Sequence, residues 1–119
     1  MRAYRLDLLY AWSSSRGIIL TPRSRIRWEE NHSADPKEVP EGYDYLLISL
    51  VYDVDERGSV VNTGYSMSSS IRSGILEELR RLLKASWIEY ADSPDSLNYR
   101  IVGLLSGFTG IREWRFKES

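Results

Sequence analysis

The sequence predicts an α+β protein in which a mainly antiparallel sheet of about four to five strands packs against one long and one shorter helix. Two observations lead to this prediction. Segments of alternating polar and apolar residues fill most of the first half of the chain and return at its end, whereas the second half repeats apolar residues at helical spacing. The 119 residues match the length of one ordinary domain, so we expect residues 1–119 to form a single unit.

Three strand-forming segments come first. Residues 2–12 carry apolar side chains at every second position, which predicts a strand with one buried face. A short strand is expected at residues 18–21. Residues 23–28 predict a further strand with one basic face, because three arginines alternate there with Ser24, Ile26 and Trp28.

A long loop and a β-hairpin follow. Residues 29–43 are mostly polar and contain two prolines and a glycine, which is typical of an irregular connection. Residues 44–54 are apolar on both faces and predict a central, well-covered strand. The sequence Asp-Glu-Arg-Gly predicts a tight turn with Gly58 in the left-handed conformation, so residues 59–65 are expected to return as the partner strand.

The second half of the chain predicts the helices. In residues 70–87 apolar side chains recur on one helical face, and the serines at 66–70 offer N-caps for this helix. Ser93 followed by Pro94 is typical of a second helix start, although residues 97–105 also fit a strand. A closing strand is expected over residues 111–117. The apolar face of the first helix is formed by Ile71, Ile75, Leu79, Leu82, Leu83 and Trp87.

Composition excludes several classes of function. The chain has no cysteine and a single histidine, which excludes disulfides, thiolate zinc sites and any site that needs two histidines. We therefore expect no metal and no cofactor. Sixteen basic residues oppose seventeen acidic ones, so no overall field draws the protein to nucleic acid or to a membrane. The charged N-terminal residues do not resemble a signal peptide, and we expect a cytoplasmic protein.

The candidate catalytic residues are few. His32 lies among carboxylates in the long loop, where it could serve as a metal ligand or a general base, but its spacing matches no metal motif and its ordinary role is that of a solvated side chain. Residues 53–58 resemble the start of a calcium loop, yet Arg57 and Gly64 stand where oxygen ligands belong. We expect a protein without catalytic residues, and an enzyme that uses His32 remains a third possibility.

Two neighbouring patches are candidate binding surfaces. Thirteen of the sixteen basic residues are arginine, and the chain has four Trp and eight Tyr, the residue types enriched at binding hot spots. The sequence leaves open which patch contacts a partner and whether the two patches instead pair with each other. The basic patch consists of Arg23, Arg25, Arg27 and Trp28, and the acidic patch consists of Glu29, Glu30, Asp35, Glu38 and Glu41.

The order of elements resembles that of the small immunity proteins of bacterial polymorphic-toxin and contact-dependent inhibition systems. The resemblance rests on the hairpin of residues 41–65, the helix of residues 70–87 and the closing Trp114-Arg115-Phe116. Some of these families end on a Trp-Glu-Phe-like strand, whereas this chain has Arg115 and then Lys117. The resemblance implies a protein that binds and occludes a cognate toxin and has no catalytic residues.

The leading hypothesis is therefore a non-enzymatic inhibitor that binds a protein partner. The alternative is a small nucleic-acid-binding module, of viral or mobile-element origin, that uses the arginine strand. No membrane partner is expected. Homodimerisation is open, because the strands at residues 2–12 and 111–117 could each lie at a sheet edge.

Overall fold

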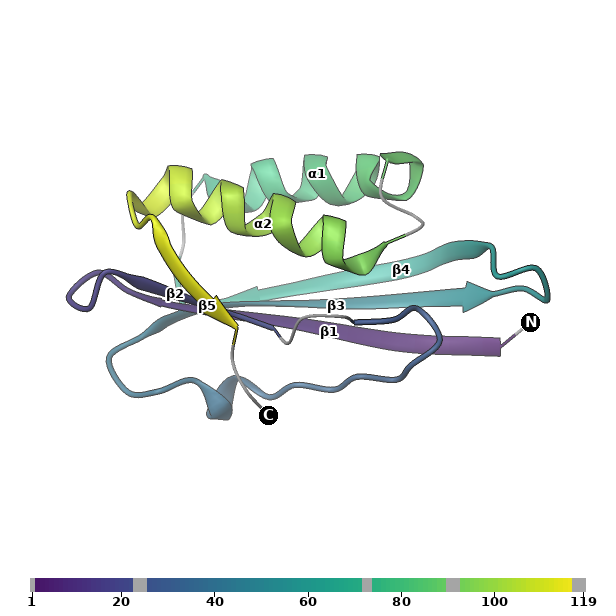
Figure 1. Cartoon of the computed structure of the whole chain (residues 1–119), viewed down its shortest axis with the longest axis horizontal. Coiled ribbons are helices and arrows are strands. Elements are labelled where there is room, and N and C mark those ends of the chain that lie inside the picture. The colour runs from purple at the N-terminus through teal and green to yellow at the C-terminus, as the bar shows by residue number, and fades with distance from the viewer. Residues whose placement is uncertain (1, 23–25, 72–73, 90–92, 117–119) are drawn as a thin grey trace.

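The computed structural model describes residues 2–22, 26–71, 74–89 and 93–116. Two helices lie side by side on one face of a five-stranded sheet, and a long connection crosses the opposite face (Figure 1). The predicted α+β class is confirmed. The strands are β1 (Arg2–Ser13), β2 (Ile18–Thr21), β3 (Asp44–Val54), β4 (Val60–Ser69) and β5 (Glu113–Phe116), and the helices are α1 (Ile75–Glu89) and α2 (Pro94–Thr109).

The strand order is β4-β3-β1-β2-β5. Three neighbouring pairs are antiparallel, but β5 runs parallel to β2, so the sheet is mixed. β1 lies inside the sheet between β3 and β2, so of the two strands that could have formed an edge only β5 does. The edges are β4 and β5. Among the described residues α1 has 15 and α2 has 16, so the two helices are of similar length rather than one long and one shorter.

The core forms where β1 and β3 face the helices. Their antiparallel register sets Leu6 opposite Leu50 and Leu8 opposite Ile48, and all four side chains are fully buried. The opposite face of β3 is only partly covered, since Val51 is exposed, so the prediction that both faces are well covered is half right. The helices contribute Leu79, Leu83, Leu97, Ile101 and Leu105 to this core.

A buried hydrogen bond ties β1 to α2. The Tyr10 hydroxyl donates to Asn98 Oδ1 at 2.6 Å, and both side chains are buried. Burial raises the pKa of Tyr10 well above its ordinary value, which keeps the phenol protonated and able to donate. This bond explains how a polar residue is accommodated in the apolar face of α2.

The serine cluster belongs to the sheet rather than to a helix cap. β4 continues to Ser69, and α1 begins only at Ile75, so the prediction of a helix from residue 70 is wrong at its N-terminal end. The Ser69 hydroxyl donates to the Tyr45 carbonyl at 2.9 Å, and the Ser70 hydroxyl accepts from the Tyr45 amide at 2.9 Å. These contacts with β3 extend the hairpin through the residues that were expected to cap the helix.

The segment after residue 93 is a helix, which resolves the choice between helix and strand at residues 97–105. Ser93 is the N-cap and accepts from the Ser96 amide at 3.2 Å, and Pro94 follows in the first turn. Gly110 ends the helix with φ at 77°. Gly58 adopts a φ of 81° in the β3–β4 turn, as predicted.

Two exposed glycines of α2 provide a stability test. Gly103 and Gly107 are exposed, and apart from the adjoining residues and the backbone of α2 itself no atom lies within 4 Å of a Cβ built at either position. Changing each to alanine is expected to raise the free energy of unfolding by about 0.5–1 kcal/mol, because alanine restricts the unfolded chain and favours the helix. Chemical denaturation measures this gain.

Gly110→Ala is the control and should destabilise the protein, because residue 110 has a left-handed φ. A loss of stability in Gly103→Ala or Gly107→Ala would contradict the claim that a methyl group fits at these positions.

Candidate functional site

The long connection takes the place of a missing strand beside β1. β2 pairs only with residues Ala11 to Ser13 of β1. The earlier residues of β1 therefore have no β2 residue opposite them on the side away from β3. There His32 forms a parallel bridge with Leu6: its amide donates to the Arg5 carbonyl at 2.9 Å, and its carbonyl accepts from the Asp7 amide at 2.8 Å. The chain then crosses beneath the sheet, on the face opposite the helices, to reach β3 (Figure 1). We call residues 29–43 the acidic loop.

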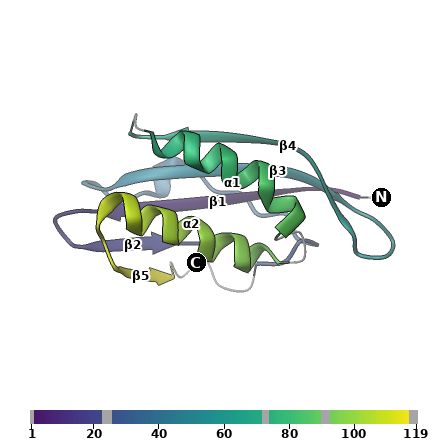
Figure 2. The same cartoon turned by 90° about the horizontal axis from the view of Figure 1, so that it is seen from above.

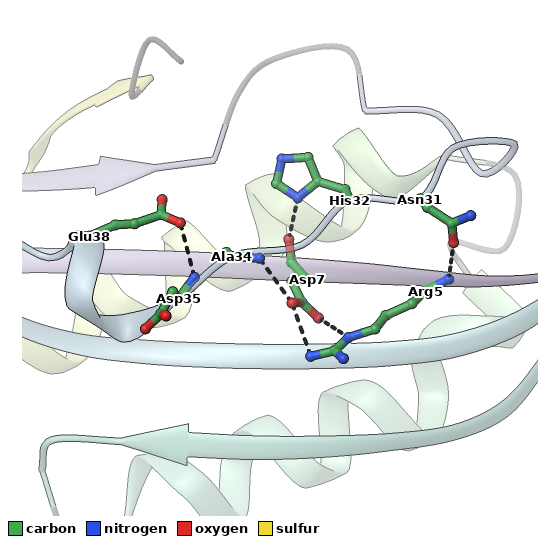
Figure 3. A network of polar contacts seen from close by, with 7 residues as sticks. All are labelled: Arg5, Asp7, Asn31, His32, Ala34, Asp35 and Glu38. Atoms are coloured by element: carbon green, nitrogen blue, oxygen red, sulfur yellow. Dashed lines mark hydrogen bonds and ion pairs between the residues drawn. The ribbon is translucent and has the colours of Figure 1, made fainter.

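The side chain of Asp7, on β1, anchors the acidic loop to the face of the sheet opposite the helices (Figure 3). This side chain is completely buried. It accepts from the Ala34 amide at 3.0 Å and pairs with the Arg5 guanidinium at 2.9 Å. Burial alone would raise the pKa of Asp7, but hydrogen bonds from Arg5, Ala34 and Ser49 outweigh it and hold the pKa below its ordinary value of 3.8. The carboxylate is therefore ionised at neutral pH and fixes the loop to the sheet.

Further hydrogen bonds hold the first part of the loop. Asn31 Oδ1 accepts from the Arg5 amide at 2.9 Å, and the Tyr52 hydroxyl donates to the Glu30 carbonyl at 2.9 Å. His32 Nδ1 lies 2.9 Å from the Asp7 carbonyl oxygen. A carbonyl oxygen only accepts, so this nitrogen carries the proton and donates. The histidine thus attaches the loop to β1, which is a structural role.

A short 3-10 helix, η1 (Pro36–Glu38), stiffens the second part. The Asp35 side chain accepts from the Lys37 amide at 2.9 Å. It also accepts from the Glu38 amide, and the Glu38 side chain accepts in return from the Asp35 amide at 3.1 Å, so that Asp35 and Glu38 make a capping box. Two of the predicted contact residues therefore also shape the loop that presents them.

All five carboxylates of the predicted acidic patch are exposed. They share the loop with one lysine, Lys37, so the surface is strongly negative. These side chains lie on one continuous segment whose first part is hydrogen-bonded to β1 and to Tyr52 on β3, and whose far end continues along the chain into β3. They are Glu29, Glu30, Asp35, Glu38 and Glu41.

The predicted basic strand is wrong where it is described. Arg23 and Arg25 lie outside the described residues, and Ile26 to Trp28 are not a strand. The Ile26 amide donates instead to Asp95 Oδ1 at 3.2 Å, which ties this segment to the start of α2. Arg27 is exposed. The Trp28 indole is buried and packs edge-to-face on Tyr52, with ring centroids 4.8 Å apart, so it serves the core and we no longer expect it to contact a partner.

The structure also shows surface features that the sequence patterns do not indicate. A groove of about 910 Å³ runs between α1 and α2 and is lined by Leu82, Tyr99, Leu104 and Phe108 among others. At the β5 edge, Trp114 contacts both Tyr99 and Phe116 edge-to-face. An inventory of helical faces could have indicated Tyr99 and Phe108, because both fall outside the buried stripe of α2.

Within residues 2–22, 26–71, 74–89 and 93–116, no three histidine, aspartate or glutamate side chains are grouped to hold a metal ion. Among the same residues, neither helix combines the length and the apolar character needed to cross a membrane. Comparison with protein-family models, with curated proteins and with solved structures finds no match to this chain.

Proposed function

We propose that this protein is a non-catalytic inhibitor that uses the acidic loop to cover a basic functional surface of a protein partner, in the manner of an immunity protein that neutralises a toxin. The observation that carries the proposal is the acidic loop itself. It exposes five carboxylates on a backbone that is hydrogen-bonded to β1 along its first part.

Anchoring matters because binding has to overcome the entropy of ordering the interface. A mobile loop would lose backbone entropy on contact, in addition to the roughly 0.5–1.5 kcal/mol that binding costs for each immobilised side chain. The Asp7 network and the capping box order the acidic loop before any partner arrives. The chain thus maintains a fixed array of negative charge at no further entropic cost for its backbone.

The sign of the charge selects the class of partner. Exposed carboxylates attract arginine and lysine and accelerate encounter with a basic surface. A nuclease-type toxin carries such a surface where it binds phosphates, and an acidic inhibitor can occupy that surface in place of the nucleic acid. The same carboxylates repel phosphates from Arg27, which makes the nucleic-acid-binding alternative the weaker of the two.

The experiment co-expresses the chain with the product of each neighbouring gene and measures association of purified pairs at low and high salt. The triple variant Glu29→Gln, Glu30→Gln, Glu41→Gln removes loop charge without touching the capping box. It should slow association about tenfold or more at low salt and flatten the salt dependence. The matched control, Glu56→Gln, Glu77→Gln, Glu113→Gln, changes the net charge equally at exposed positions elsewhere and should associate like the wild type.

Two results would contradict the proposal: no stable complex with any neighbouring product, or equal effects of the two triple variants. A salt-dependent shift of short RNA or DNA that is lost on changing Arg23, Arg25 and Arg27 to alanine would favour the nucleic-acid alternative.

A further inference from the structure

One long edge of the sheet is uncovered. β4 forms this edge and pairs with β3 on one side, while no other described segment pairs with its outer side (Figure 2). The strand has ten residues, against four in the opposite edge strand β5. Its outer backbone amides and carbonyls are therefore available to another strand.

Apart from one bulge in its first half, this edge lacks the features that keep edge strands from pairing with one another. Proteins usually protect an edge with charged side chains, proline or a very short strand. No charged residue and no proline occurs between Arg57 and Arg72, although 28% of the whole chain is charged. The edge strand β5, by contrast, is short and carries the Glu113–Arg115 ion pair. A bulge opposite Val51 and Tyr52 interrupts the first half of β4 and leaves the second half, from Gly64 to Ser69, regular.

The backbone of this regular half fixes how a partner strand can bind. The Ser70 backbone amide donates to the Tyr45 backbone carbonyl on β3, so it points toward β3. Because strand amides alternate in direction, those of Tyr65, Met67 and Ser69 point away from β3. Suppose that the added strand is a second β4 that runs antiparallel, with Ser66 opposite Ser66. The outward backbone groups of Tyr65 in one strand would then form hydrogen bonds with those of Met67 in the other strand.

The side chains match this arrangement when the second strand is another β4. Tyr65 is 43% exposed and Met67 is partly buried, and both lie on the helix side of the sheet. In the antiparallel pair each tyrosine ring would cover the methionine of the other copy, a favourable sulfur–aromatic contact. Ser66 would face Ser66, and no like charges would oppose each other at any position of the strand.

We propose that two copies of this chain associate through their β4 edges in an antiparallel, twofold-symmetric pair. The second copy fits because a single uncharged segment provides matching donors, acceptors and side chains to itself, and the twofold axis closes the assembly at two chains. The two sheets become continuous, both helix layers lie on one face, and both acidic loops remain free on the other. The proposal therefore does not depend on the function proposed above.

The test is sedimentation equilibrium of the full chain and of charged variants. The wild type is expected at twice the chain mass of 13.8 kDa. Ser66→Lys combined with Ser68→Lys gathers four lysines around the twofold axis and should weaken the dimer about tenfold or more, as should the corresponding pair of glutamates. An equimolar mixture of the lysine and glutamate variants should restore dimers, which separates lost pairing from lost folding.

The matched control is Ser14→Lys with Ser15→Lys in the exposed β1–β2 turn, which should remain dimeric. Hydrogen exchange adds a local readout: the amides of Tyr65 and Met67 should exchange more slowly as the protein concentration rises. A wild type that is monomeric at all concentrations would overturn the proposal. So would a dimer that the lysine and glutamate variants leave unchanged.

Discussion

Replacing Trp28 with alanine is expected to lower the free energy of unfolding by about 3–5 kcal/mol. The indole is buried and packs edge-to-face on Tyr52, which is itself fully buried and stacks on Tyr4 with ring centroids 5.7 Å apart. Removing the indole deletes one member of this aromatic cluster and leaves a cavity between the long connection and the sheet. The loss should appear in urea denaturation followed by far-ultraviolet circular dichroism.

The neighbouring residue supplies the control. Arg27 is exposed, and Arg27→Ala should change the stability by no more than about 0.5 kcal/mol. The comparison separates the two roles that the sequence leaves open for Trp28. A Trp28→Ala variant with nearly wild-type stability and impaired partner binding would contradict the core role and return Trp28 to the binding surface.

Changing Asp7 to asparagine is expected to cost about 1–3 kcal/mol at neutral pH. The variant keeps the volume of the side chain but loses the ion pair with Arg5 and weakens the bond from the Ala34 amide. The acidic loop should then open more often. Faster hydrogen exchange at the amides of His32 and Ala34 would report this opening directly.

The same substitution should make the stability less sensitive to acid. The pKa of Asp7 in the folded protein lies below its ordinary value of 3.8, so the folded state binds this proton less readily than the unfolded state. The contribution of Asp7 is therefore complete above pH 3.8 and is lost as the pH falls through the folded pKa. The difference in the free energy of unfolding between the wild type and Asp7→Asn should narrow on acidification. A gap that is constant with pH would contradict the assigned role.

The sequence predicts those elements whose local pattern agrees with their tertiary surroundings. The strand at residues 44–54 and the turn with Gly58 follow from alternation and turn chemistry, and both are confirmed. The serines at 66–70 show the opposite case, because hydrogen bonds to Tyr45 on β3 outweigh their tendency to cap a helix. The parallel pairing of β5 with β2 was not predicted, since its partner lies at the other end of the sequence.

The candidate site likewise has one part that the sequence predicts and one part that it does not. Exposure of the acidic residues follows from the polarity of a loop with prolines, and the structure agrees. The anchor does not follow from the pattern, because Asp7 occupies the polar register of an amphipathic strand and is expected to face water. It is buried because a loop more than twenty residues further along the chain closes over it, with Ala34 as the direct contact. The alternation of residues within one strand cannot show that a distant segment of the chain packs over one of its side chains.

The pairing of β5 with β2 also affects how the protein reaches its native state. This pairing sets Ile18 beside Glu113 and Thr21 beside Phe116, so nearly the whole chain must be in place before it forms. Contacts of such long sequence separation slow folding, because the loop that they close loses much entropy before any contact is gained. They also link the second strand of the chain to the last one, and through β2 they join β5 to the β1–β2 hairpin. We therefore expect the β1–β2 hairpin and the final strand to unfold in a single cooperative step.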